Sequence, residues 1–300
     1  MPPKPGPPPR NVSRKRVRAR RLGALAVLLV ILATGIGIAL AAGGSGSKTT
    51  APTTIGVVLE HQFRVIFPEG FTRRQMASRV QAVARIAHRE RGVRPKLSRR
   101  TYLAVTRAKR RIPGFGAKRL PLEGFLFPAT YNFTKKTSSA QLVATQLKTF
   151  EASWSGLDLR YAQSKNLTPY DVLNIAAMVE KETLAPDERP LVAAVIYNRL
   201  HARMPLGIDA TLRYGLHIAP TQSIRQSQLD SDNPYNTRKL LGLPPTPIAN
   251  PGLASMQAAA HPAHVNYVYF VRKPDHVHHF FTASFSAFQA YERKHGYHPH

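Results

Sequence analysis

The sequence contains no cysteine and few acidic residues. Without cysteine, disulfide bonds, thiolate chemistry and cysteine-ligated zinc are excluded. Only 16 aspartates and glutamates oppose 43 lysines and arginines, which gives a formal net charge of +27. A glycine-rich phosphate loop is also lacking, because Gly114 and Gly116 are not followed by a Lys-Ser/Thr pair. The excess of positive charge favours a polyanionic partner: nucleic acid, an anionic membrane surface or an anionic wall polymer.

The N-terminal region predicts a membrane anchor. Residues 1–21 form a proline-rich tail with eight lysines and arginines and no acid, and residues 22–42 then run without any charge. A helix of that length spans about 30 Å, the thickness of the hydrocarbon core of a bilayer. Residues 43–54, rich in Gly, Ser and Thr, are typical of a flexible linker. The basic tail predicts a cytoplasmic N-terminus with the rest of the chain outside.

A cleaved signal peptide is the alternative, because residues 39–41 (ALA) resemble a cleavage site. The apolar segment is longer than the apolar region of a usual signal peptide, which favours a retained anchor. In both cases the remaining chain is exported, so we expect no nucleic acid as partner. With the retained anchor, we expect a localisation at the cell membrane. An anionic wall polymer or lipid is then the natural counter-charge.

Two parts are expected beyond the linker, and together they predict an α+β protein. Residues 55–117 form a small subdomain: a strand within 55–67, a helix that begins at Arg73 after the N-cap Thr72, and a second helix near 102–109. A basic loop at 110–119 marks the boundary, and residues 118–300 form the second domain. The expected elements of that domain are helices at 139–150, 168–182, 191–200 and 284–294 and strands at 265–271 and 280–282.

Acidic residues, scarce elsewhere, are concentrated in one short segment. Four of the 16 are Glu180, Glu182, Asp187 and Glu188. Glu180 and Glu182 follow the apolar residues 173–179 on the expected helix, so either carboxylate can be carried into an apolar environment. Desolvation raises a carboxyl pKa and keeps the group protonated, as a general acid requires. The alternative is a solvated helix end whose acids pair with Lys181 or Arg189.

Several blocks, in one order, resemble the endolytic murein transglycosylase (MltG/YceG-like) family. They are residues 122–131 (LEGFLFPATY), 177–183 (AMVEKET), 195–200 (VIYNRL), 234–237 (PYNT), 242–253 (GLPPTPIANPGL) and 267–271 (YVYFV). The resemblance covers roughly residues 55–290. It implies a membrane-anchored enzyme with a LysM-like subdomain before the catalytic domain. It also implies cleavage of the β-1,4 bond between N-acetylmuramic acid and N-acetylglucosamine. Cell-wall synthases are expected as partners, and no cofactor is expected.

The same resemblance places the family's catalytic glutamate at Glu180. The expected supporting or substrate-binding residues are Glu182, Tyr197, Asn198, Asp209, Thr211, Tyr235, Asn236 and Asn250. Tyr197 and Asn198 offer donors for N-acetyl groups, and Asp209 and Thr211 are expected in a loop. Each has a structural alternative: a polar stripe on a helix, or a turn in a proline-rich loop.

No metal site is expected. The histidines at 276, 278 and 279 are interpreted as a hairpin loop, because no carboxylate–histidine framework surrounds them. Two rival functions remain open from the sequence. One is a membrane-anchored peptidoglycan-binding module without turnover. The other is an exported polyanion-binding protein, whose binding would collapse with salt.

Overall fold

The structure, a computed structural model, describes residues 62–297. The predicted tail, apolar segment and linker at 1–54 lie outside the described residues. Within the described part, no helix combines the length and the apolar character that crossing a bilayer requires. In chain order the elements are β1 Phe63–Ile66, α2 Arg73–Arg91, α3 Arg99–Arg107, β2 Thr130–Phe133, α4 Ser139–Trp154, α5 Arg160–Ser164, α6 Pro169–Glu182, η1 Pro186–Glu188, α7 Arg189–His201, α8 Asp209–Leu216, α9 Gln226–Leu229, α10 Leu253–Ala260, β3 Tyr269–Arg272, β4 His279–Thr282 and α11 Phe285–Lys294.

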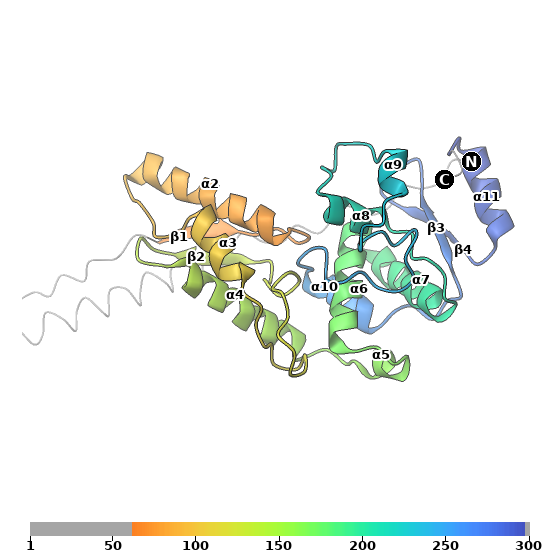
Figure 1. The fold of residues 1–300 in the computed structure, drawn as a ribbon, viewed down its shortest axis with the longest axis horizontal. Coiled ribbons are helices and arrows are strands. Elements are labelled where there is room, and N and C mark those ends of the chain that lie inside the picture. The colour runs from red at the N-terminus through yellow and green to blue at the C-terminus, as the bar shows by residue number, and fades with distance from the viewer. Residues whose placement is uncertain (1–61, 298–300) are drawn as a thin grey trace, which may run out of the picture. The chain divides into compact units, whose positions relative to one another are not determined.

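The first group of elements is built on a two-stranded antiparallel sheet. β1 pairs with β2 in a register that sets Phe63 opposite Phe133. Helices α2, α3 and α4 gather around this pair (Figure 1). Thr72 caps α2 as the sequence predicts, and its hydroxyl accepts a hydrogen bond from the Gln75 amide in a capping box. The helix ends at Gly92, whose φ of 63° is the left-handed conformation that glycine adopts at low cost.

The β1–β2 pairing crosses the boundary that the sequence suggests at residue 118. β1 lies in the expected N-terminal subdomain, whereas β2 lies 12 or more residues beyond its end. The two strands cannot be separated without breaking the ladder. Residues 62–297 accordingly belong to one compact unit.

Helix α6 is the central element of the second group. Thr168 caps it, Pro169 occupies its first turn, and Asp171 completes the capping box. Every residue from 172 to 179 is buried, and all but Asn174 are apolar, so the helix is enclosed on all sides along its middle. Helices α10 and α7 pack against it (Figure 1). A helix enclosed in this way holds the residues at its C-terminal end in fixed positions.

The C-terminal strands form a hairpin, and α11 packs on it. β3 pairs with β4 in antiparallel register, with Tyr269 opposite Thr282. The expected strand at 265–271 is shorter and later than predicted, because β3 begins at Tyr269. With two small antiparallel sheets among helices, the expected α+β class is confirmed.

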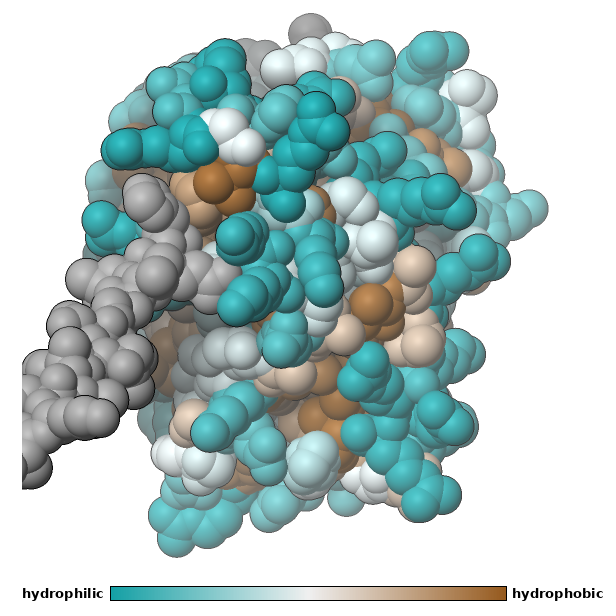
Figure 2. Space-filling view, turned by 90° about the vertical axis from the view of Figure 1, so that its left-hand side faces the viewer, coloured by the Kyte–Doolittle hydropathy of each residue, from teal (hydrophilic) through white to brown (hydrophobic). Residues whose placement is uncertain are grey.

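Much of the surface is hydrophilic. The face in Figure 2 is mostly teal, and its apolar side chains appear in small separate areas. The largest exposed apolar side chains of the described residues are dispersed over several elements: Ile66, Ile86, Leu184, Leu241 and Phe285. Scattered apolar residues of this kind are ordinary for a globular protein.

Candidate active site

Glu180 lies at the C-terminal end of α6, where the buried part of the helix gives way to solvent. The residue before it is fully buried, and Glu180 itself is partly buried. Its carboxylate oxygen Oε2 accepts two hydrogen bonds, from the Gly252 amide at 3.0 Å and from the Ser255 hydroxyl at 2.7 Å. Both donors belong to the first turn of α10, where free amides and the helix dipole favour a negative charge. The carboxylate is therefore held by one oxygen, and no protein donor within the described residues bonds to Oε1.

The alternative of an ion-paired helix end does not describe Glu180. Among residues 62–297, no lysine, arginine or histidine nitrogen lies within 4.0 Å of its carboxylate. Glu180 is instead held by neutral donors on a neighbouring helix. Such donors orient the group without neutralising it, and this suits a carboxyl that exchanges protons.

The neighbours of the Glu182 carboxyl differ from those of Glu180. Desolvation raises its pKa to about 7; the Asp209 charge also raises it, while Arg272, Lys181 and the Ala210 amide lower it. Apart from Lys181 on α6 itself, these neighbours belong to α8 and β3 and not to α10. The structure thus separates the two glutamates of the α6 end: Glu180 faces α10, and Glu182 faces the start of α8.

A second carboxylate that the sequence did not single out, Glu69, lies beside Glu180. It follows β1 in the turn 68–70, on a residue that is exposed overall. Desolvation of its carboxyl raises its pKa, the negative charge of Glu180 raises it further, and the Arg189 guanidinium lowers it. A turn glutamate carries no periodic signal. The only sequence feature that could have drawn attention to it is the scarcity of acids.

Asn250 and Glu123 form a buried polar junction behind this site. The Asn250 side-chain oxygen accepts hydrogen bonds from the Gly124 and Leu126 amides, both at 2.9 Å. Its amide nitrogen donates to the Phe71 carbonyl at 2.8 Å and to Glu123 Oε1 at 2.9 Å. Every strong hydrogen-bonding position of the side chain is thus used within the protein. Asn250 holds three distant segments together, which is the structural role that the sequence left open for it.

Glu123 is a buried carboxyl that receives three donors. They are the Arg73 amide at 2.7 Å, the Asn250 amide and the Tyr214 hydroxyl at 3.0 Å. Burial raises its pKa to about 7, although these hydrogen bonds and the Arg73 charge lower it. The residue stands in the block 122–131 but was not among the predicted site residues. Its contacts link α2 to α8 and identify it as a group that holds the fold together.

Tyr197 and Asn198, expected as donors to N-acetyl groups, donate to backbone carbonyls of the protein. The Tyr197 hydroxyl bonds to Ala259 at 2.9 Å, and the side chain is almost fully buried. The Asn198 amide bonds to Val265 and Tyr267, both at 2.9 Å. The geometry therefore favours the structural alternative, a polar stripe of α7 that fastens the segment before β3.

Asp209 and Thr211 lie in the first turn of α8, so the expectation of a loop was wrong. A helix of only eight residues without a side-chain cap gives little periodic signal, which explains the error. Asp209 pairs with Arg238 at 2.7 Å. Thr211 is fully buried, and its hydroxyl lies 2.9 Å from that of Thr237.

Tyr235 and Asn236 lie in the loop before α10, as expected. The Tyr235 hydroxyl is 2.8 Å from that of Thr246, and its ring packs edge-on against Tyr214 with centroids 5.1 Å apart. Asn236 is fully buried and donates to the Leu229 and Ser231 carbonyls, both at 2.8 Å. Glu180, by contrast, is partly buried, and its Oε1 has no protein donor within the described residues.

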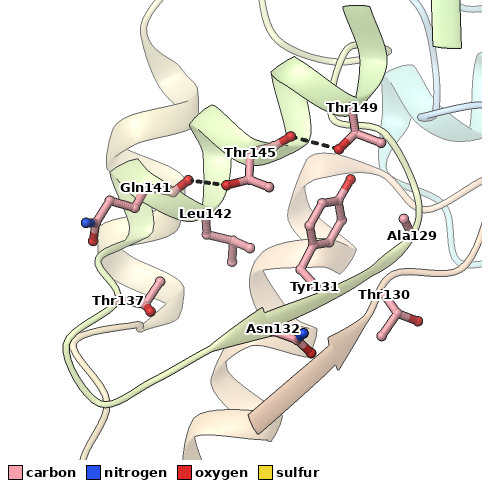
Figure 3. A pocket seen from close by; sticks show the side chains of 9 residues that line it. All are labelled: Ala129, Thr130, Tyr131, Asn132, Thr137, Gln141, Leu142, Thr145 and Thr149. Carbon is pink, nitrogen blue, oxygen red and sulfur yellow. Dashed lines mark hydrogen bonds between the residues drawn. The ribbon is translucent and has the colours of Figure 1, made fainter. Parts of the chain in front are cut away.

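Two cavities lie on the first group of elements, away from the predicted residues. One, of about 560 Å³, lies between β2 and α4, with Tyr131 opposite Thr145 and Thr149 (Figure 3). Those two hydroxyls donate to carbonyls of their own helix. The other, of about 440 Å³, is lined by Phe71 and by three arginines, Arg74, Arg79 and Arg99. None of the nine predicted site residues lines either cavity.

In the described part of the chain, no three His, Asp or Glu side chains gather into a group that could hold a metal ion. His279, one of the histidines in the C-terminal cluster, is buried in β4. Its Nδ1 lies 2.7 Å from Glu188 Oε2, and its amide donates to Glu188 Oε1 at 2.8 Å. The pair fastens β4 to the start of α7.

Comparison with known proteins gives a consistent result. The model of the YceG-like family matches residues 46–294. The chain is 36% identical over 155 residues to an endolytic murein transglycosylase of Bacillus subtilis (strain 168), which aligns 51% of this chain and 42% of that protein. It is 35% identical over 160 residues to one of Streptococcus pneumoniae (strain R6), with 51% and 28% aligned. The matches thus span less than half the length of these curated relatives.

A solved structure shares the fold. The crystal structure of a yceG-like protein from Listeria monocytogenes superposes with a TM-score of 0.62 at 27% sequence identity. The match covers 76% of this chain and 75% of that one.

Proposed function

The chain belongs to the YceG-like family, and from this premise we propose that it is an endolytic lytic transglycosylase of peptidoglycan. The observation that carries the proposal is the placement of Glu180. Its carboxylate lies near the end of a buried helix, is oriented by two donors of α10, and has no cationic partner among residues 62–297. One carboxyl held in this way suits a reaction in which a single group first gives and then takes a proton.

The proposed reaction breaks the bond between C1 of N-acetylmuramic acid and the O4 of N-acetylglucosamine. Glu180 donates its proton to the leaving O4 as the C1–O4 bond breaks. It then accepts the proton of the muramic acid 6-hydroxyl, whose oxygen closes on C1. The products are a strand ending in 1,6-anhydro-muramic acid and a strand with a free 4-hydroxyl. No water is consumed, so the reaction differs from that of glycosidases, which use two carboxylates and hydrolyse the bond.

Substrate binding by the first group of elements is part of the proposal. We infer that residues 55–117 contribute a LysM-like subdomain; the order β1, α2, α3, β2 supports this, with β2 extending the unit beyond residue 117. The arginine-lined cavity beside Phe71 offers positive charge to anionic groups of the wall. Residues 22–42 are proposed as a single-pass anchor with a cytoplasmic N-terminus, which would place the enzyme beside cell-wall synthases.

The test uses the full-length protein in detergent with purified uncrosslinked glycan strands and mass spectrometry of the products. We expect the wild type to release fragments that end in anhydro-muramic acid and are one water lighter than hydrolysis products. Glu180→Gln keeps the shape of the side chain but removes its proton exchange, so it should release none. Glu151→Gln, an exposed acid on α4, is the matched control and should act as the wild type does.

Two outcomes contradict the proposal. Reducing ends from the wild type mean that water attacks C1, and the enzyme is then a hydrolase. Strand binding without cleavage by any variant favours the alternative, a peptidoglycan-binding module without turnover.

A further inference from the structure

The carboxylates of Glu69 and Glu180 both lie next to Gly252. The Gly252 amide donates to Glu180 Oε2 at 3.0 Å. A Cβ atom built on the same residue would overlap the Glu69 carboxylate. Because the N and Cβ positions of one residue are about 2.5 Å apart, the nearest oxygens of the two carboxylates lie no more than about 8 Å from each other. Glu69 therefore occupies the space that the missing side chain of residue 252 leaves.

Backbone hydrogen bonds hold the Glu69 turn in this position. The Gly70 amide donates to the Asn250 carbonyl at 3.0 Å, and the Asn250 amide donates to the Phe71 carbonyl at 3.0 Å. Gly70 has a φ of 73°, which favours glycine, and its Cα faces the Glu180 side chain. These bonds fix the segments 69–71 and 250–252 relative to each other, with Glu69 on one and Gly252, a donor to Glu180, on the other.

Several charged groups surround Glu69, but none of those in residues 62–297 forms an ion pair with it. Desolvation raises its pKa, the charge of Glu180 on α6 raises it further, and the charge of Arg189 at the start of α7 lowers it. Lys181 is the other nearby cation, with its side chain close to Gly70. Among the described residues, however, no cation lies within 4.0 Å of the Glu69 carboxylate. The Arg189 Nε is itself buried without a hydrogen-bond partner.

We propose that Glu69 is a positioning residue of the active site, which acts through its negative charge on the proton that Glu180 transfers. This inference rests on the proposed transglycosylase function. Two carboxyls at this range do not ionise independently, because a negative charge on Glu69 opposes the loss of a proton from its neighbour. Glu180 needs that proton when the C1–O4 bond breaks, and the 6-hydroxyl returns it in the second step. The turn after β1 is then part of the catalytic centre.

The test is the pH dependence of kcat for the full-length enzyme on glycan strands. Glu69→Gln removes the charge and keeps the side-chain shape. We expect its alkaline limb to move to lower pH by about one unit, the size of a screened like-charge interaction at this range. KM should stay within about twofold, and Glu69→Asp should restore the limb in part. Glu151→Gln removes the same charge from an exposed site on α4 and should leave the profile unchanged.

Gly252→Ala provides an independent test, because it moves Glu69 without altering it. The backbone at Gly252, with φ −78° and ψ 172°, suits alanine, but the added methyl group must displace the Glu69 carboxylate. We expect a shift of the alkaline limb in the same direction. If the methyl group acts through Glu69, the double variant Glu69→Gln/Gly252→Ala should shift no further than Glu69→Gln alone.

The outcomes separate this inference from the function on which it rests. If the wild type forms anhydro ends but Glu69→Gln leaves the pH profile in place, the inference is wrong and the transglycosylase stands. Fully additive shifts in the double variant also overturn it, because Gly252 would then act on Glu180 directly. If the wild type forms no anhydro ends, the proposed function itself fails. Thermal unfolding of each variant shows whether it is folded. If Glu69→Gln does not fold, the pH profile of Gly252→Ala still tests the inference.

Discussion

Ser255 donates a hydrogen bond from its hydroxyl to Glu180 Oε2, over 2.7 Å. The two residues are 75 positions apart and lie on different helices, α10 and α6. Together with the Gly252 amide, Ser255 decides which oxygen of the glutamate is held and which is left for a substrate. The role of this serine can be tested directly.

Replacement of Ser255 by alanine should lower kcat and leave KM nearly unchanged. A hydrogen bond to a charged group contributes roughly 1.5 kcal/mol or more, which corresponds to a loss of about tenfold in rate. The measurement is the rate of anhydro-end formation at saturating strand concentration. Ser164→Ala, which removes an exposed hydroxyl from α5, is the control. An unchanged kcat for Ser255→Ala would show that the Gly252 amide orients Glu180 alone.

Tyr197→Phe should affect stability and not catalysis. The substitution removes the hydroxyl that bonds to Ala259 and leaves a buried carbonyl without its donor, which costs about 1–2 kcal/mol of unfolding free energy. The matched control is Tyr161→Phe, whose ring lies 5.4 Å from that of Tyr197 and whose hydroxyl has no partner within the described residues. Urea unfolding and strand cleavage are measured for both. A large rise in KM for Tyr197→Phe would mean that the hydroxyl binds substrate after all.

The raised pKa of Glu123 predicts that the folded protein loses stability as the pH rises. Burial raises its pKa from 4.5 to about 7, so between these values the native state keeps a proton that the unfolded chain has released. This contribution to stability is complete below about pH 4.5 and is lost as the pH rises through 7, by up to roughly 3 kcal/mol. Glu182 shifts in the same direction and acts in the same range.

The corresponding measurement is the urea midpoint of the wild type and of Glu123→Gln from pH 4.5 to 7.5. The variant cannot ionise at residue 123, so its midpoint should depend less steeply on pH, whatever its absolute stability. Glu182→Gln, measured in parallel, separates the second carboxyl. Parallel curves for the wild type and Glu123→Gln would show that Glu123 titrates alike in the native and unfolded chain.

Helices with strong local signals were predicted well from the sequence. Thr72 and Thr168 cap α2 and α6 where expected, because a capping box is encoded within four residues. The long helices α4 and α7 were also placed, with ends shifted by up to four residues. The short helix α8 and the late start of β3 were missed, because few residues carry a periodic pattern there. The family resemblance is confirmed by the match over residues 46–294.

The candidate site residues came from the sequence, but their hydrogen-bond partners did not. The family resemblance pointed to Glu180 as the catalytic glutamate, whereas the residues alone left Glu180 and Glu182 open. For four other candidates the sequence left both a sugar contact and a structural role open, and in the structure their side chains bond to the protein itself: Tyr197, Asn198, Asn236 and Asn250. Residue type reveals a hydrogen-bonding capacity but not the partner that uses it.

By itself, then, the sequence determined the long helices, their caps and the family, and the family resemblance pointed to the glutamate at the end of α6. Caps and periodicity depend on neighbours a few positions away. Only the tertiary structure decided that Gly252 and Ser255 hold this glutamate, that Glu69 lies beside it, and that Asn250 joins the segments behind it. These contacts link positions 72 to 179 residues apart. Local periodicity carries no information on such pairs, because their geometry arises when separate segments pack into one core.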